Sequence, residues 1–171
     1  ARDADQLRHA GLEQFVAREG LQHVEHRLAV VADGRDAVET DDALHGVLRY
    51  VVFGGEALNV GALAPWWNRH GRTRPQLINM YGITETTVHV TFLELRDEDI
   101  DRNVSNIGRP LPTMKTYILD RKLNPQPIGI PGELCVSGDG VGRGYLNNEP
   151  LTRAKFVANP YEPGETLYRS G

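Results

Sequence analysis

The sequence predicts an α/β fold whose first part is a βαβ unit and whose second part is a β-rich, barrel-like subdomain. Two apolar runs, 48–53 and 76–80, have the length and character of buried strands. A segment long enough for a helix, 59–70, lies between them. Beyond residue 103 the chain becomes a series of short apolar segments between turn-forming residues, which is typical of β-rich structure.

Composition and charge narrow the class of protein. The 171 residues are 40% hydrophobic and 25% charged, which is ordinary for a soluble globular protein. The formal net charge of -4 argues against a nucleic-acid or anionic-membrane partner, so a small solute is the expected ligand. No apolar run approaches the length of a membrane helix. The single cysteine, Cys135, lies in an apolar run, and we expect a small buried hydrophobe in a reducing compartment, the cytoplasm.

The first 48 residues contain one clear pattern. Apolar residues at helical spacing over 3–19 predict an amphipathic helix that ends at Gly20. The run 28–32 fits either the end of a helix or a short strand. His23 and His26 have a spacing that can ligate a metal, but no cysteine or carboxylate completes the set, so we predict no metal site there.

The strand–helix–strand segment predicts where a ligand binds. Pro65 marks the start of the intervening helix or a break in it. The two strands of a βαβ unit are parallel, so both end at the same edge of the sheet, where open α/β sheets bind ligands. We therefore expect the glycine-bearing turns 54–57 and 81–85, each with a carboxylate, to lie side by side.

The stretch 76–88 carries the strongest chemical signal. Gly82 permits a turn just past the strand, and the hydroxyls and carboxylate of 84–87 follow it, as suits a phosphate and its metal ion. Alternatively, Thr84 is an N-cap and Glu85 a favourable acid in a first helical turn. The neighbouring turn at 54–57 favours the binding site.

The second part of the chain is predicted from shorter signals. Residues 88–92 alternate like a strand, and 96–101 form an acidic surface turn. A boundary near residue 103 separates two domains, 1–103 and 104–171. Further strands are expected at 115–119, 132–137 and 166–169, with one short helix at 151–156.

A glycine-rich run at 138–144 resembles a phosphate-binding loop. The dinucleotide fingerprint needs a helix directly behind it, whereas 145–150 contains turn formers and a proline. We therefore predict a turn that brings Arg143 or the backbone close to another element.

Four stretches resemble successive core motifs of one family, in the right order and at the right spacing. They are Phe53-Gly-Gly-Glu-Ala-Leu58, Asn79-Met-Tyr-Gly-Ile-Thr-Glu-Thr-Thr87, Gly132-Glu-Leu-Cys-Val-Ser-Gly-Asp-Gly-Val-Gly-Arg-Gly-Tyr-Leu146 and Leu167-Tyr-Arg-Ser-Gly171. On these motifs the chain resembles the amino-acid adenylation domains of nonribosomal peptide synthetases, in the superfamily of adenylate-forming synthetases and ligases. The resemblance is specific over 48–171 and loose over 1–48.

The resemblance implies that an amino-acid carboxylate attacks the α-phosphorus of ATP to give an aminoacyl-adenylate and pyrophosphate. The acyl group then passes to the phosphopantetheine of a carrier domain, beside a condensation domain. Thr84 and Glu85 would be the catalytic residues: Thr84 binds a phosphate oxygen and Glu85 holds Mg²⁺. The residues implied for nucleotide binding are Gly55, Glu56, Ala57, Asn79, Met80, Tyr81, Gly82 and Thr84.

The resemblance also implies an amino-acid pocket with a glycine floor and a histidine able to pair a hydroxyl, which favours threonine over serine or another small polar amino acid. The other interpretation of His89 is a core histidine with satisfied hydrogen bonds. The implied pocket residues are Val52, Gly54, Met80, Val88 and His89.

Several departures from the family lead us to expect a fragment truncated at both ends and inactive alone. The phosphate loop and the aspartate for the substrate amino group would precede Ala1, and the ribose-binding aspartate would follow Gly171. The family's catalytic lysine is absent, and 21–27 lacks the expected strand and turn. The alternatives are an acyl-CoA or aryl-acid ligase of the same superfamily, or a non-catalytic remnant or interaction module.

Overall fold

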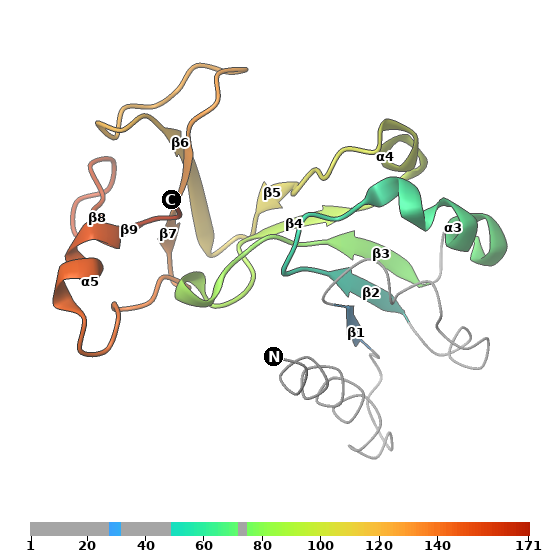
Figure 1. Ribbon diagram of the computed structural model, residues 1–171, viewed down its shortest axis with the longest axis horizontal. Helices are drawn as coiled ribbons and strands as arrows, with labels where there is room; N and C mark the ends of the chain where they lie inside the picture. Colours follow the sequence, from blue (N-terminus) through green and yellow to red (C-terminus); the bar gives the residue numbers. More distant parts are fainter. Residues whose placement is uncertain (1–27, 32–48, 72–74) are drawn as a thin grey trace, which may run out of the picture.

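The computed structural model describes residues 28–31, 49–71 and 75–171, which form two sheets (Figure 1). The first sheet has five strands in the order β1-β2-β3-β4-β5, and the second has four in the order β6-β7-β9-β8. The helix expected at 3–19 and the histidines at 23 and 26 lie outside the described residues.

The first sheet begins with the predicted parallel strands. β2 and β3 pair in parallel, with Val52 opposite Ile78 and Phe53 opposite Asn79, so the βαβ prediction is confirmed. β1 pairs in parallel with β2, so the described part of the ambiguous run, 28–31, is a strand. β4 and β5 continue the sheet in antiparallel pairing. The strands are β1 (Leu28–Val31), β2 (Tyr50–Phe53), β3 (Gln76–Asn79), β4 (Thr91–Glu94) and β5 (Arg109–Pro110).

The crossover between β2 and β3 is a 3₁₀ turn, η2 (Val60–Leu63), followed by the helix α3 (Ala64–His70). Pro65 lies in the first turn of α3, where its missing N–H has no helical partner to lose, so it marks the start of the helix. The crossover packs its apolar residues on one face of the sheet. The buried residues of this core are Val51, Phe53, Leu58, Val60, Leu63, Trp66, Trp67, Leu77 and Leu95.

Two expectations about the segment after β3 are wrong. The expected acidic surface turn at 96–101 is a helix, α4 (Asp97–Arg102). Its acidic residues fill the first turn, where they favour the helix dipole, and the Asp99 carboxylate accepts a 2.9 Å hydrogen bond from the Arg96 amide. The strand expected at 88–92 begins three residues later, at β4, because Thr87 and Val88 have φ values of 59° and 68° and cannot be extended.

The second sheet contains the predicted strands and one more. β6 (Met114–Leu119), β7 (Glu133–Gly138) and β9 (Thr166–Arg169) lie within two residues of their expected bounds. The short helix is α5 (Glu149–Lys155), and it runs directly into β8 (Phe156–Ala158), which the sequence patterns did not predict.

The barrel-like closure expected for this subdomain is absent from the described sheet, which is open with β6 and β8 at its edges. A barrel needs enough tilted strands to bring its edges together. The described sheet has four strands, and β8 pairs with β9 over just three residues. The predicted domain boundary near residue 103 stays a prediction.

Two smaller apolar clusters accompany the second sheet. Val90, Met114 and Val136 pack with Tyr81, which connects the loop after β3 to β6 and β7. Cys135 packs with Leu119 and Leu167 and is fully buried, as predicted. Burial, reinforced by the nearby Glu133 carboxylate, raises the pKa of the Cys135 thiol to about 11, so this thiol is inert at neutral pH. Among the described helices, none is long and apolar enough to cross a membrane.

Candidate functional site

The two glycine-bearing turns leave the sheet at the same edge. Phe53 and Asn79, the last residues of β2 and β3, are register partners in parallel strands. A 2.8 Å hydrogen bond from the Met80 amide to the Phe53 carbonyl extends this pairing by one residue. The turns at 54–57 and 81–85 therefore begin beside each other, as expected for a ligand site at a sheet edge.

The loop after β3 contains a short 3₁₀ turn, η3 (Thr84–Thr86). Thr86 is fully buried, and its hydroxyl bonds to both the amide and the carbonyl of Ile83, at 3.3 and 3.1 Å. Thr84 is exposed and Glu85 is half-buried. Thr86 thus anchors the turn, while Thr84 and Glu85 are accessible to a ligand.

A strained segment follows η3. The amide of His89 donates to the Thr87 carbonyl at 2.8 Å, which closes a γ-turn around Val88. Val88 has a φ of 68°, which is unfavourable for a β-branched residue, and its side chain is 58% exposed. Backbone strain of this kind persists where surrounding contacts enforce it, often at ligand sites.

Three of the five candidate pocket residues come together. An ideal Cβ on Gly54 would lie 3.4 Å from the Met80 carbonyl oxygen and 3.5 Å from Cε1 of His89. Val52 is buried in β2, on the face that its alternation with Val51 and Phe53 gives it, and Gly54 follows just past the end of the strand. This face is opposite the one that packs on α3, because the alternate residues Val51 and Phe53 belong to that core. Val88, which precedes His89 in the chain, is exposed.

The candidate nucleotide residues are more dispersed. Gly55, Glu56 and Ala57 are exposed in the first turn. Asn79 is only 2% exposed, and its side-chain amide donates a 2.8 Å hydrogen bond to the Asn106 carbonyl. Tyr81 packs against the cluster around Val90. In the described structure, therefore, Asn79 holds the segment before β5.

The glycine-rich run 138–144 contacts the loop after β3 with its backbone. The Gly142 amide donates a 2.8 Å hydrogen bond to the Glu85 carbonyl, and the Thr87 hydroxyl donates one of 2.7 Å to the Gly140 carbonyl. An ideal Cβ on Gly140 would lie 2.8 Å from Sδ of Met114 and 3.0 Å from the Thr86 carbonyl oxygen, so a side chain does not fit there. The predicted close approach of this backbone to another element is confirmed.

The Glu85 carboxylate has a partner that sequence reasoning missed. The Tyr145 hydroxyl donates a 2.6 Å hydrogen bond to Oε1 of Glu85. This bond lowers the pKa of Glu85 despite an opposing effect of burial, and it raises the pKa of Tyr145. Glu85 is therefore ionised at neutral pH. In the sequence, Tyr145 stands directly after the glycine run and within the third family motif, and neither position predicts its contact with Glu85.

The available ligands fit Mg²⁺ bound together with a nucleotide. The part of the chain that the structure describes contains no cluster of three or more histidine, cysteine or acidic side chains. Mg²⁺ needs no such cluster, because it is usually held by one or two carboxylates together with substrate phosphates and water. Glu85 supplies an ionised carboxylate and Thr84 an exposed hydroxyl, both hard oxygen ligands.

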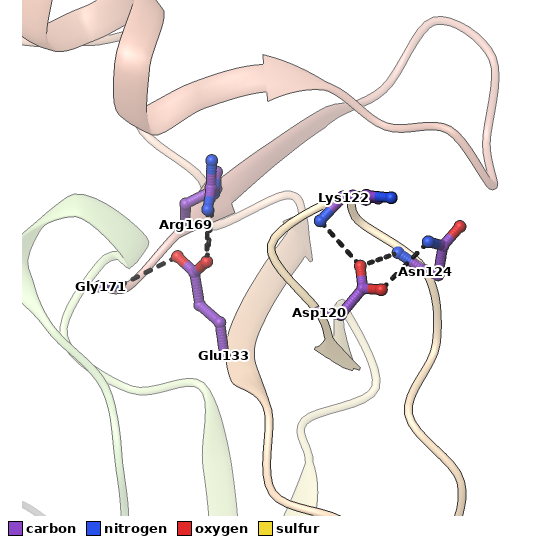
Figure 2. Close-up of polar contacts among 6 residues, drawn as sticks. All are labelled: Asp120, Lys122, Asn124, Glu133, Arg169 and Gly171. Atoms are coloured by element: carbon purple, nitrogen blue, oxygen red, sulfur yellow. Dashed lines mark hydrogen bonds and ion pairs between the residues drawn. The ribbon is translucent and has the colours of Figure 1, made fainter.

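Two further carboxylates stabilise the second sheet (Figure 2). Glu133 binds Arg169 through Oε2 at 2.7 Å and accepts the Gly171 amide on Oε1 at 3.1 Å, which fixes the end of β9. Asp120 accepts the amides of Lys122 and Asn124, both at 2.8 Å, and so fixes the turn after β6.

Comparison with known proteins gives consistent matches. Residues 11–146 match the family model described as AMP-binding enzyme. The chain is 57% identical over 127 residues to a plipastatin synthase polypeptide of Bacillus subtilis (strain 168). The aligned residues make up 74% of this chain and 5% of that protein. It is 54% identical over 126 residues to the dimodular nonribosomal peptide synthase of the same organism. Here the aligned residues make up 72% of this chain and 5% of that protein.

A solved structure of an NRPS protein containing adenylation and PCP domains superposes with a TM-score of 0.73 and 28% identity. The superposition covers 95% of this chain and 32% of that one. The chain thus spans a small part of the length of these relatives. The family model covers well over half of the chain, and the relatives and the fold agree with it. The chain belongs to the family of AMP-binding enzymes and is closely related to the adenylation domains of nonribosomal peptide synthetases.

Proposed function

We propose that this chain is part of an amino-acid adenylation domain, which forms aminoacyl-AMP and pyrophosphate from an amino acid and ATP. The acyl group is then transferred to the phosphopantetheine of a carrier domain in the same cytoplasmic synthetase, beside a condensation domain. The observation that carries the proposal is the sheet edge at which the Thr84–Glu85 loop lies beside the group formed by Gly54, Met80 and His89.

The chemistry suits these residues. An amino-acid carboxylate is already ionised at neutral pH, so the first step needs no general base, and catalysis depends on positioning and charge neutralisation. Glu85 holds Mg²⁺, which neutralises phosphate charge, and Thr84 donates to a phosphate oxygen. The turn 55–57, together with Asn79, Met80, Tyr81 and Gly82, borders the nucleotide.

We further propose that Val52, Gly54, Met80, Val88 and His89 select the amino acid, and that this amino acid is threonine. The missing side chain at Gly54 leaves space beside the imidazole of His89. That space suits a small side chain, and the imidazole can pair with its hydroxyl. Serine or another small polar amino acid is the second candidate.

The test uses the complete domain that we propose contains this chain. The measurement is amino-acid-dependent ATP–pyrophosphate exchange. Threonine should support exchange, and Glu85→Gln should lower its rate about a hundredfold or more, because the isosteric amide lacks the charge that binds Mg²⁺. The control Glu94→Gln changes an exposed glutamate on β4 and should have no effect. Exchange with a bulky aromatic amino acid and none with threonine would contradict the pocket assignment.

The same assay separates the alternatives. Exchange driven by carboxylic acids without an amino group would identify an acyl-CoA or aryl-acid ligase instead. No exchange with any acid would favour a non-catalytic remnant or interaction module. We also propose that the 171-residue chain alone is inactive, because it corresponds to 32% of the solved adenylation protein. Exchange by the isolated chain would refute that.

A further inference from the structure

A line of three polar groups connects the Glu85 loop to the second sheet. The Tyr145 hydroxyl lies 2.6 Å from Oε1 of Glu85 and 3.3 Å from the hydroxyl of Tyr168 in β9. An ionised carboxylate only accepts hydrogen bonds, so the proton of Tyr145 is directed at Glu85. In the contact between the two phenols Tyr168 is therefore the donor, and hydrogen bonding from Tyr168 also helps to lower the pKa of Glu85.

The ring of Tyr145 is held by packing. It makes an edge contact with Phe156 at a centroid distance of 5.4 Å, and Phe156 makes another with Tyr168 at 5.0 Å. The amide of Tyr145 donates a 2.8 Å hydrogen bond to the Thr152 hydroxyl in α5. Both the backbone and the ring of Tyr145 are therefore fixed before its hydroxyl meets Glu85.

The glycine-rich run explains how Tyr145 reaches Glu85. Three residues before Tyr145, the Gly142 amide bonds to the Glu85 carbonyl at 2.8 Å. An ideal Cβ on Gly142 would lie only 3.2 Å from that carbonyl oxygen, so glycine allows the close approach. One short segment thus holds the main chain of Glu85 with an amide and its carboxylate with a phenol.

We propose that Tyr145 is a positioning residue that orients the Glu85 carboxylate toward Mg²⁺ and the nucleotide; this inference rests on the proposed function. A glutamate side chain has considerable rotamer freedom, and a hydrogen bond to one carboxylate oxygen restricts it. The carboxylate keeps further lone pairs for a cation, because its two oxygens offer about four acceptor sites. Groups that orient metal ligands in this way tune metal affinity.

A purely structural role for Tyr145 is the competing explanation, and it has a different signature. The bonds from Gly142 to the Glu85 carbonyl and from Thr87 to the Gly140 carbonyl also fasten the loop to the second sheet. Both remain in Tyr145→Phe, which also keeps the aromatic ring. The variant therefore removes the contact to the carboxylate and leaves the other fastenings in place.

The experiment uses the complete domain, with Mg²⁺ and ATP as the probes. Titration calorimetry should show that Tyr145→Phe weakens Mg²⁺-dependent binding of ATP about tenfold or more. The Mg²⁺ concentration for half-maximal exchange should rise similarly, while the KM for the amino acid should stay unchanged. The control Tyr117→Phe alters a tyrosine that stacks on Tyr161 in the same subdomain, and it should leave both Mg²⁺ measurements unchanged.

Tyr168→Phe provides a second test if Tyr145→Phe does not fold. It removes the donor to Tyr145, so it should shift the Mg²⁺ dependence in the same direction by a smaller factor. The positioning role would be overturned if a folded Tyr145→Phe variant kept the Mg²⁺ dependence of the wild type. If Tyr145→Phe does not fold, the same result in Tyr168→Phe would overturn it. Failure of the wild-type domain itself to bind ATP with Mg²⁺ would instead refute the proposed function and this inference with it.

Discussion

The carbonyl oxygen of Val88 lies so close to Gly82 that an ideal Cβ on the glycine would be 2.0 Å from it. The carbonyl carbon of Val88 and Cα of His89 would lie 2.6 and 2.9 Å from the same Cβ. All three are main-chain atoms, so no rotamer change can make room. Gly82 therefore allows the two arms of the loop after β3 to touch.

Gly82→Ala should destabilise the protein by about 1–3 kcal/mol, the usual cost of forcing an extra carbon into packed structure. Thermal unfolding followed by circular dichroism measures the change. The matched control is Gly54→Ala, whose nearest neighbour would be the Met80 carbonyl oxygen at 3.4 Å, an ordinary contact. Equal melting temperatures for the two variants would show that the loop relaxes freely around residue 82.

Val88→Asn should stabilise the protein and, in the complete domain and under the proposed function, weaken the selection of amino acids. Asparagine tolerates a positive φ better than a β-branched residue does, and valine at a φ of 68° costs about 1 kcal/mol. Little packing is lost, because Val88 is 58% exposed. The melting temperature should rise while the KM for the amino acid increases, which is the trade-off expected at a strained ligand site.

Val104→Asn is the control for this prediction. Val104 is similarly exposed, at 62%, but it is absent from the residues with positive φ. Its replacement should leave the stability unchanged. A rise of the same size in both variants would mean that replacing an exposed apolar side chain, and not relieving backbone strain, explains the effect at position 88.

Sequence reasoning found the elements whose patterns are local. The strands β2, β3, β6, β7 and β9 each have an apolar run bounded by turn formers, and the parallel arrangement of β2 and β3 followed from the helix between them. That topology brought Gly54 and the turn after β3 to one edge. The edge at which the candidate site lies was thus predictable without coordinates.

The errors arose where distant contacts decide the structure. Thr87 and Val88 carry strand-forming side chains, yet hydrogen bonds to Gly140 and Ile83 hold them in left-handed backbone and delay β4. Asp97–Arg102 is acidic enough to suggest a turn, but the hydrogen bond that Trp67, 30 residues away, donates to Asp97 favours a helix. Tyr145 is 60 residues from Glu85, and no local pattern predicts that pairing.

If the chain is part of a threonine-activating domain, as proposed above, His89→Leu in the complete domain should reduce the preference for threonine over valine in amino-acid-dependent exchange. The two amino acids have similar shapes, and only threonine has a hydroxyl for the imidazole to pair. Losing one such hydrogen bond costs about 0.5–1.5 kcal/mol, so the preference should fall severalfold to about tenfold. The ratio of kcat/KM values measures it. An unchanged ratio would show that His89 is a core histidine without contact to the substrate.

Glu133→Gln should destabilise the protein in a pH-dependent way. Burial alone would raise the pKa of Glu133, but the hydrogen bonds from Arg169 and the Gly171 amide outweigh it and hold the pKa below its ordinary value of 4.5. A depressed pKa means that the folded state favours the ionised form. The stabilisation is therefore fully present above pH 4.5 and is lost as the pH falls through the lower pKa of the folded state.

At pH 7 the loss should be about 1 kcal/mol, because the Glu133 and Arg169 side chains retain 14% and 30% of their exposure and solvent screens the pair. The difference between wild type and variant should shrink below pH 4.5, the ordinary pKa of the residue. Urea unfolding at pH 7 and below pH 4 measures both. Glu149→Gln weakens a largely exposed pair with Arg153 and should cost less, about 0.5 kcal/mol. A Glu133→Gln effect that persists undiminished in acid would show that Glu133 acts through packing and not through its charge.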